Sequence, residues 1–102
     1  MSKDRQIIRA PAQDVLIVFD RSSSHPVEYA ITLRVLRDGK WQTIHCFDNA
    51  HDFQEHHEHR YVGDHKEPPV ITNGDTNAAM AAATQKLLKS WPEIVEAWEK
   101  TR

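Results

Sequence analysis

The segment from Val27 to Phe47 constrains the fold most, because its pattern is that of a β-hairpin. Apolar residues alternate with polar or small ones from Val27 to Val35, which is the period of a half-buried strand. Asp38-Gly39 follows, a pair typical of the two-residue type I′ turn. Residues 41–47 are then the returning strand. A two-residue turn fixes the register, so the pairing across the hairpin can be predicted.

The predicted register places Arg34 opposite Thr43 and Thr32 opposite His45. Arg34 and His45 are then diagonal neighbours on the more polar face of the hairpin, within reach of each other's long side chains. These two residues either belong to a site or line a solvated sheet surface. The opposite face is predicted to be core and carries Ile31, Leu33, Val35, Ile44 and Cys46.

Other segments before residue 73 have the composition of strands or extended chain. Val15–Phe19 is a continuous apolar run, which fits a strand covered on both faces. His57–Val62 alternates and ends in β-branched and aromatic residues. Residues 66–72 contain Pro68-Pro69, which disfavours helix. Residues 1–12 are expected to be a flexible arm that contains at most a short edge strand.

The C-terminal region has the pattern of helices. Asp75 or Thr76 caps a helix that runs to about Lys89. Ser90-Trp91-Pro92-Glu93 then opens a second helix, or continues the first one with a kink at proline. Both segments are predicted to supply core and not chemistry. The predicted fold is α+β, with an antiparallel sheet of four to five strands packed by C-terminal helices.

Composition narrows the class of protein. A chain of 102 residues predicts a single domain, residues 1–102. The formal net charge of -2 gives no overall attraction to nucleic acid, so a phosphate site must be local. Cys46 is the only cysteine, which excludes an intrachain disulfide and a cysteine-based zinc finger. No signal peptide and no apolar run long enough to span a membrane is present, so a cytoplasmic location is expected.

The stretch from Phe47 to Val62 is the candidate for function. It contains four of the chain's seven histidines: His51, His56, His57 and His59. Aspartate and glutamate residues are interleaved with them. Read as a strand, the segment places His57, His59 and Tyr61 on one face and Arg60 on the other.

The residue types suit metal-independent cleavage of RNA. Two histidines can act as general base and general acid, and an arginine can stabilise the charge that develops on phosphorus. Arg60 is predicted to bind the phosphate and Tyr61 to position it, while His45 supports the site from the sheet. The candidate catalytic residues are His45, His57, His59, Arg60 and Tyr61.

Two other interpretations stay open at this point. In the first, zinc or another divalent metal is bound by His57 and His59 with His51 or Asp48 as a third ligand. In the second, the histidines form hydrogen bonds with neighbouring carboxylates and perform no chemistry. The ribonuclease hypothesis requires no cofactor, and removal of metal therefore distinguishes it from the first of these.

The stretch also resembles a known family. Phe47-Asp48-Asn49-Ala50-His51 followed by His56-His57-Glu58-His59-Arg60 is similar to the signature of TumE-type toxins of bacterial and archaeal toxin–antitoxin modules. Those proteins similarly have a strand that ends in an aromatic-Asp-Asn-Ala motif, then a histidine pair and a further histidine. This chain has Glu55 and Glu58 where that family leads one to expect a proline and a basic residue around the histidine pair.

The resemblance implies a cytoplasmic toxin held by an antitoxin protein. Combined with the residue types, it predicts a small α+β protein that acts as an endoribonuclease. The alternative is a histidine-rich metal-binding domain or a non-catalytic interaction domain. The predicted partners are an antitoxin and RNA, with a second copy of the chain as a further candidate, and no membrane.

Overall fold

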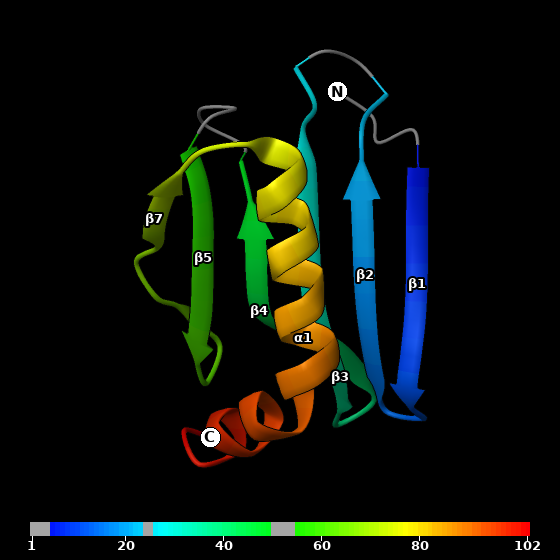
Figure 1. The fold of residues 1–102 in the computed structure, drawn as a ribbon. Coiled ribbons are helices and arrows are strands. Elements are labelled where there is room, and N and C mark those ends of the chain that lie inside the picture. The colour runs from blue at the N-terminus through cyan, green and yellow to red at the C-terminus, as the bar shows by residue number, and fades with distance from the viewer. Residues whose placement is uncertain (1–4, 24–25, 50–54) are drawn as a thin grey trace.

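Figure 1 shows a computed structural model of the chain, in which one long helix packs on one sheet. The structure describes residues 5–23, 26–49 and 55–102. The strands in chain order are β1 (Arg5–Ala12), β2 (Val15–Arg21), β3 (Tyr29–Arg37), β4 (Lys40–Asp48), β5 (Glu55–Val62), β6 (His65–Lys66) and β7 (Val70–Asn73). The helix α1 spans Thr76–Glu99.

The first five strands pair antiparallel with their neighbours in chain order. β6 and β7 both pair with β5, at its C-terminal and N-terminal halves respectively. The predicted α+β fold with an antiparallel sheet is therefore confirmed, but four to five strands is too few because the sheet has seven within the described ranges. Two of the additional strands are β1, which lies where a flexible arm was expected, and the two-residue β6.

The β3–β4 hairpin has the predicted turn but only part of the predicted register. Asp38 and Gly39 have φ values of 54° and 76°, as the type I′ turn requires. The pairing is as predicted from the turn to Arg34 and Thr43. A β-bulge follows, and Leu33 pairs with His45 instead of Ile44. The predicted pairing of Thr32 with His45 is therefore wrong, and so is the predicted position of His45 beside Arg34.

The bulge places an additional side chain under the helix. Ile44 is fully buried in the core, and His45 follows it to the same side, where it lines cavities together with α1 residues. Two residues of a bulged strand oppose one residue of its partner, so alternation is interrupted there. Cys46 consequently pairs with Thr32 and lies on the outer face, not on the predicted core face.

The helix begins at a side-chain cap and bends near a proline. The Asp75 carboxylate accepts a hydrogen bond from the Ala78 backbone N–H at 2.8 Å, which satisfies one of the exposed N–H groups of the first turn. Pro92 lies inside α1, and Figure 1 shows the helix changing direction in its C-terminal part. Of the two predicted alternatives, the kinked continuation is therefore the one observed, and a separate second helix is not, because proline removes a hydrogen bond without ending the helix.

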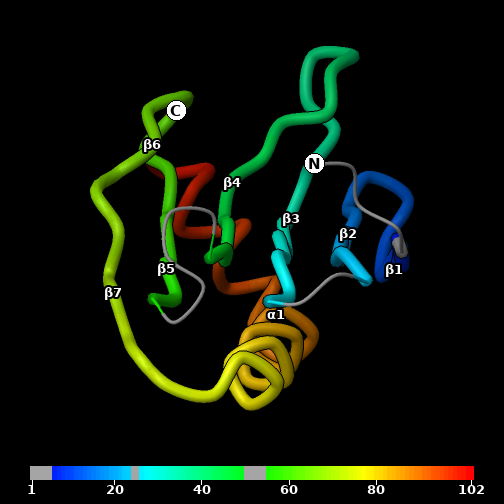
Figure 2. The backbone as a smooth tube through the Cα atoms, turned by 90° about the horizontal axis from the view of Figure 1, so that it is seen from above, coloured from blue at the N-terminus to red at the C-terminus, as the bar shows by residue number. Residues whose placement is uncertain are grey.

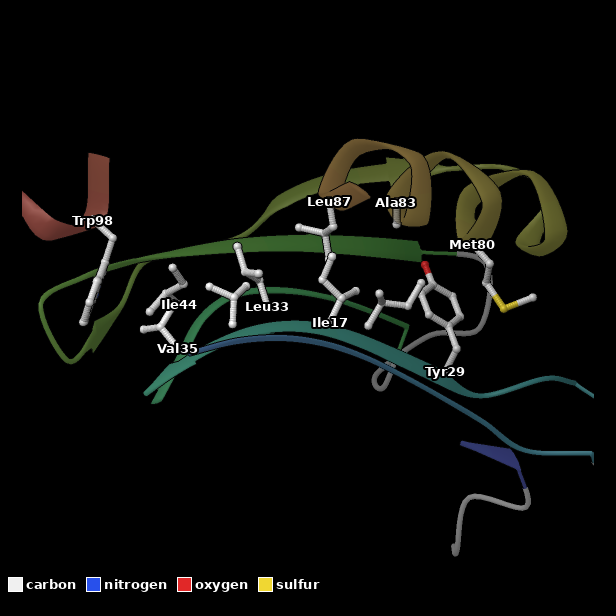
Figure 3. Close-up of a cluster of buried hydrophobic side chains, with 11 residues drawn as sticks. Ile17, Tyr29, Leu33, Val35, Ile44, Met80, Ala83, Leu87 and Trp98 are labelled. Carbon is white, nitrogen blue, oxygen red and sulfur yellow. The ribbon is translucent and has the colours of Figure 1, made fainter. Parts of the chain in front are cut away.

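The core lies between α1 and the concave side of the curved sheet (Figure 2). In Figure 3, Leu87 and Ala83 point from the helix towards the sheet, over Leu33 and Ile17. The Trp98 indole N–H donates to the Gly63 carbonyl at 2.7 Å, which ties the end of α1 to the turn after β5. None of the helical segments in the described part of the chain has the length and apolarity that crossing a bilayer requires.

Candidate active site

The structure divides the five predicted catalytic residues between two faces of the sheet. His45 on β4 pairs with Arg60 on β5, and both line cavities on the helix side. His57, His59 and Tyr61 alternate with Arg60 along β5 and belong to the outer face. Arg60 and His45 are therefore brought together, and Tyr61 lines the cavity of about 310 Å³ with them. His57 and His59 do not line either of the cavities that His45 and Arg60 share.

A carboxylate missing from the predicted set lies at the centre of the helix-side cluster. Glu58 Oε2 is 2.8 Å from Nε2 of His45 and also accepts a hydrogen bond from the Lys86 ammonium of α1. Glu58 pairs across the strands with Phe47, and the Lys86 ammonium lies 5.9 Å from the centre of the Phe47 ring. Side chains from β4, β5 and α1 thus meet above Phe47.

These side chains line a cavity of about 430 Å³. Its charged and titratable groups are His45, Glu58, Arg60, Glu67 and Lys86. Lys86 also lines two adjoining cavities, of about 200 Å³ and about 310 Å³. The cavities therefore meet at the Lys86 side chain, which spans from the helix to β5. Arg60 and Lys86 bring two positive charges to the cavity of about 430 Å³, and Glu58 and Glu67 bring two negative ones.

Burial and the neighbouring charges set the protonation of the His45–Glu58 pair. Burial lowers the pKa of His45 below its usual 6.5, the hydrogen bond to Glu58 opposes this, and Lys86 and Arg60 reinforce it. Burial alone would raise the pKa of Glu58, but the bonds from Lys86 and His45 outweigh it, so the pKa falls below 4.5. At neutral pH the pair is therefore a neutral imidazole that donates to a carboxylate.

The second ring nitrogen of His45 also favours the neutral form of the imidazole. Nδ1 is buried and is the one such side-chain nitrogen or oxygen without a hydrogen-bond partner in the described ranges. A protonated ring would hold an N–H there without an acceptor, which costs free energy. The accessible chemistry of His45 is therefore at Nε2, the nitrogen that faces Glu58.

The outer-face histidines are held by neighbours on β4, on their own strand and on the segment after it. His57 is buried, with Nε2 3.3 Å from a Glu55 oxygen and Nδ1 3.8 Å from an Asp48 oxygen. The Nδ1 atom of His59 bonds the Glu67 carbonyl at 2.9 Å, and the two imidazole rings lie 6.2 Å apart. Burial raises the pKa of Tyr61 on the same face.

His56 has a structural role, because both of its ring nitrogens are occupied. The Tyr29 hydroxyl lies 2.9 Å from Nδ1, and the Gly74 carbonyl lies 3.0 Å from Nε2. The carbonyl can only accept, so Nε2 carries the proton and Nδ1 accepts from the hydroxyl. Burial raises the pKa of Tyr29 to about 12, which keeps this hydroxyl a donor. His56 thus joins β3, β5 and the turn before α1.

The described part of the structure gives the metal-binding interpretation no supporting arrangement of ligands. His51, one of its three predicted ligands, lies outside the described residues. Among the residues with described positions, no three histidine, cysteine, aspartate or glutamate side chains are arranged to hold a metal ion. The zinc hypothesis for His51, His57 and His59 stays a prediction.

Two residues of the helix-side cluster were missed by sequence reasoning. Glu58 is not among the predicted catalytic residues, although strand alternation places it on the same face as Arg60. Lys86 lies in a helix that was assigned to the core alone. Nothing in the local sequence indicates that this lysine reaches across to β5, since that contact depends on how α1 lies on the sheet.

A family model described as "Domain of unknown function (DUF7718)" matches residues 3–102. The chain belongs to this family. Comparisons with curated proteins and with solved structures found no match. The family description makes no reference to toxins or ribonucleases, so the resemblance to TumE-type toxins stays a prediction. For this DUF7718 chain, the chemistry of the helix-side cavity is the basis for a functional assignment.

Proposed function

We propose that the chain binds single-stranded RNA and cleaves it, without a metal ion, in the cavity between β5 and α1. One observation carries this proposal: a carboxylate, an imidazole and two cationic side chains line the same cavity of about 430 Å³. These four residues are His45, Glu58, Arg60 and Lys86. They supply a proton acceptor, a proton donor and positive charge, which are the functions that phosphodiester transfer requires.

The proposed reaction is an attack by the ribose 2′-oxygen on the adjacent phosphorus. The Glu58 carboxylate takes the 2′-hydroxyl proton as the new oxygen–phosphorus bond forms. Protonated His45 gives its Nε2 proton to the leaving 5′-oxygen as that bond to phosphorus breaks. The products are a 2′,3′-cyclic phosphate and a free 5′-hydroxyl. Arg60 and Lys86 stabilise the charge that develops on the non-bridging oxygens.

The hydrogen bond from Lys86 to Glu58 is compatible with this reaction. Half of the Lys86 side-chain surface is exposed and the side chain is flexible, so its ammonium can move to a bound phosphate. Its departure frees Glu58 Oε2 from one of its two donors. Binding of phosphate therefore increases the basicity of the carboxylate just where a proton has to be removed.

The same activity fits the resemblance to toxin–antitoxin toxins. A ribonuclease of this kind would arrest growth when it is expressed alone, and an antitoxin would cover the cavity or its entrance. Expression with and without induction tests the cellular part of the proposal. Growth arrest by the wild-type chain, relieved by Glu58→Gln, is the result expected.

The decisive experiment measures cleavage of a fluorescently labelled RNA oligonucleotide in the presence of a chelator. Glu58→Gln and His45→Gln should each lower the rate by about 10²-fold or more, because each removes one proton-transfer group. His59→Gln is the matched control, since His59 lies on the outer face, and it should retain wild-type activity. Circular dichroism of each variant verifies that the fold is kept.

The opposite pattern would contradict the proposal. Loss of cleavage in His59→Gln, with activity kept in Glu58→Gln, would place the reaction on the outer face with His57 and Tyr61. If the wild-type chain does not cleave RNA, the proposed activity is rejected, and a non-catalytic interaction domain is the interpretation that remains.

A further inference from the structure

The smallest of the three connected cavities has the size and walls of a pocket for one flat ring. It encloses about 200 Å³, which is less than the roughly 300–1,000 Å³ of pockets that hold drug-sized ligands. The sheet contributes the aromatic residues Tyr29 and Phe47 to its lining. A ring fits such a space, whereas a whole nucleotide does not.

Three alanines on α1 create this space. Ala79, Ala82 and Ala83 line the cavity, and their spacing of three and four residues puts them on one face of the helix. Lys86 continues the same face one turn later and lines the cavity as well. Any larger side chain at these positions would fill the volume between the helix and the two aromatic residues.

The pocket opens beside the proposed catalytic cavity. Glu58, Val70 and Lys86 line both cavities, and Arg60 lines only the larger of the two. A ring in the alanine-walled pocket and a phosphate near Arg60 would therefore lie on the two sides of Lys86. A flat ring joined to a phosphate through a sugar is the chemical description of a nucleotide.

We infer that the alanine-walled pocket binds one nucleobase of single-stranded RNA, an inference that rests on the RNA binding proposed above. The base packs between the aromatic residues of the sheet and the alanine methyl groups of α1, while its phosphate enters the catalytic cavity. Aromatic side chains bind bases of single strands by stacking, which tolerates different sequences. The pocket thus selects an unpaired base, since a base in a duplex is stacked on its neighbours.

The test uses two probes, uridine 3′-monophosphate and ribose 5-phosphate, and isothermal titration calorimetry. The wild-type chain should bind the nucleotide roughly tenfold or more tightly than the sugar phosphate, because only the nucleotide has a base to stack. Ala82→Leu fills the pocket from an exposed position and should remove this difference while binding of ribose 5-phosphate is unchanged. Ala81→Leu makes the same substitution outside the cavity lining and should bind both probes like the wild type.

Three results would overturn the inference. They are equal affinity of the wild-type chain for both probes, no binding of either probe, and nucleotide binding that Ala82→Leu leaves intact. Ala82→Met is the second variant if leucine disturbs folding. The RNA cleavage assay separates this inference from the proposed activity. Base-dependent binding without cleavage would keep the pocket and reject the catalysis, whereas equal cleavage by wild type and Ala82→Leu would reject the pocket alone.

Discussion

His45 and Glu58 determine the pH at which the proposed reaction can run. The reaction needs protonated His45 as the acid and ionised Glu58 as the base. The pKa of His45 lies below 6.5 because of burial, and that of Glu58 lies below 4.5 because the bonds from Lys86 and His45 outweigh burial. The required form is therefore most populated between the two lowered pKa values, on the acidic side of pH 6.5.

We accordingly predict an acid-shifted pH profile for RNA cleavage. As pH rises through the lowered pKa of His45, the acid is lost and the rate should fall. As pH falls through the lowered pKa of Glu58, the base is lost and the rate should fall again. Measurement of kcat/KM against pH checks both limbs.

The variant Lys86→Met tests whether Lys86 lowers the pKa of His45. Lys86 lowers the pKa of His45, so its removal should move the alkaline limb to higher pH even though the maximal rate drops. A maximum above pH 6.5 in the wild type, or an alkaline limb that Lys86→Met does not move, would contradict the assignment of His45 as the acid.

At the scale of elements, the hairpin shows what could be predicted from the sequence. The alternation and the Asp38-Gly39 turn determine the strands and their first pairs, because these depend on neighbouring residues. The bulge at Ile44 could not be predicted, because Ile44 is a core residue in either register. The bulge moves Cys46 to the outer face and His45 to the helix side, and with His45 the candidate site moves to the helix side. The position of Lys86 was beyond prediction for a similar reason, since it depends on the packing of α1.

The residue that directly follows β4 joins two strands of the sheet. Asn49 is fully buried, and its side-chain amide donates to the Val27 carbonyl at 2.8 Å. Its carbonyl oxygen accepts from the Tyr29 N–H at 2.9 Å. Asn49 therefore joins the end of β4 to the start of β3, and this residue of the Asp-Asn-Ala motif has a structural function irrespective of any toxin activity.

We predict that Asn49→Ala destabilises the chain by about 2 kcal/mol or more. The buried Tyr29 N–H and the partly buried Val27 carbonyl lose their partners, and such a loss costs about 1–3 kcal/mol for a buried group. Chemical denaturation gives the free energy of unfolding. Asn77→Ala is the control, because Asn77 is exposed on α1 and alanine there changes stability by less than about 1 kcal/mol. Equal stability of the two variants would show that the Asn49 hydrogen bonds contribute little.

At the scale of the whole molecule, net charge and local charge oppose each other. The formal charge of -2 repels RNA at long range, while Arg60 of β5 and Lys86 of α1 line the same cavity. Glu58 and Glu67 line the same cavity, so the free site is close to neutral. The molecule is therefore suited to bind a short segment of one strand at a defined place, and not to coat a polyanion.

This distribution of charge predicts a shallow dependence of RNA binding on salt. A single strand that replaces counterions with two cationic side chains gives a slope of log K against log salt concentration near about −1.4, from roughly −0.7 per contact. Lys86→Met should halve the slope, because one of the two contacts is gone. Lys40→Met is the control, since Lys40 is exposed at the β3–β4 turn and should not change the slope. Fluorescence anisotropy of a labelled RNA between about 50 and 200 mM salt measures it. The prediction fails if Lys86→Met leaves the slope unchanged, or if Lys40→Met flattens it equally. Counterion release counts only the cations that touch phosphate, so either result would mean that RNA contacts a different surface.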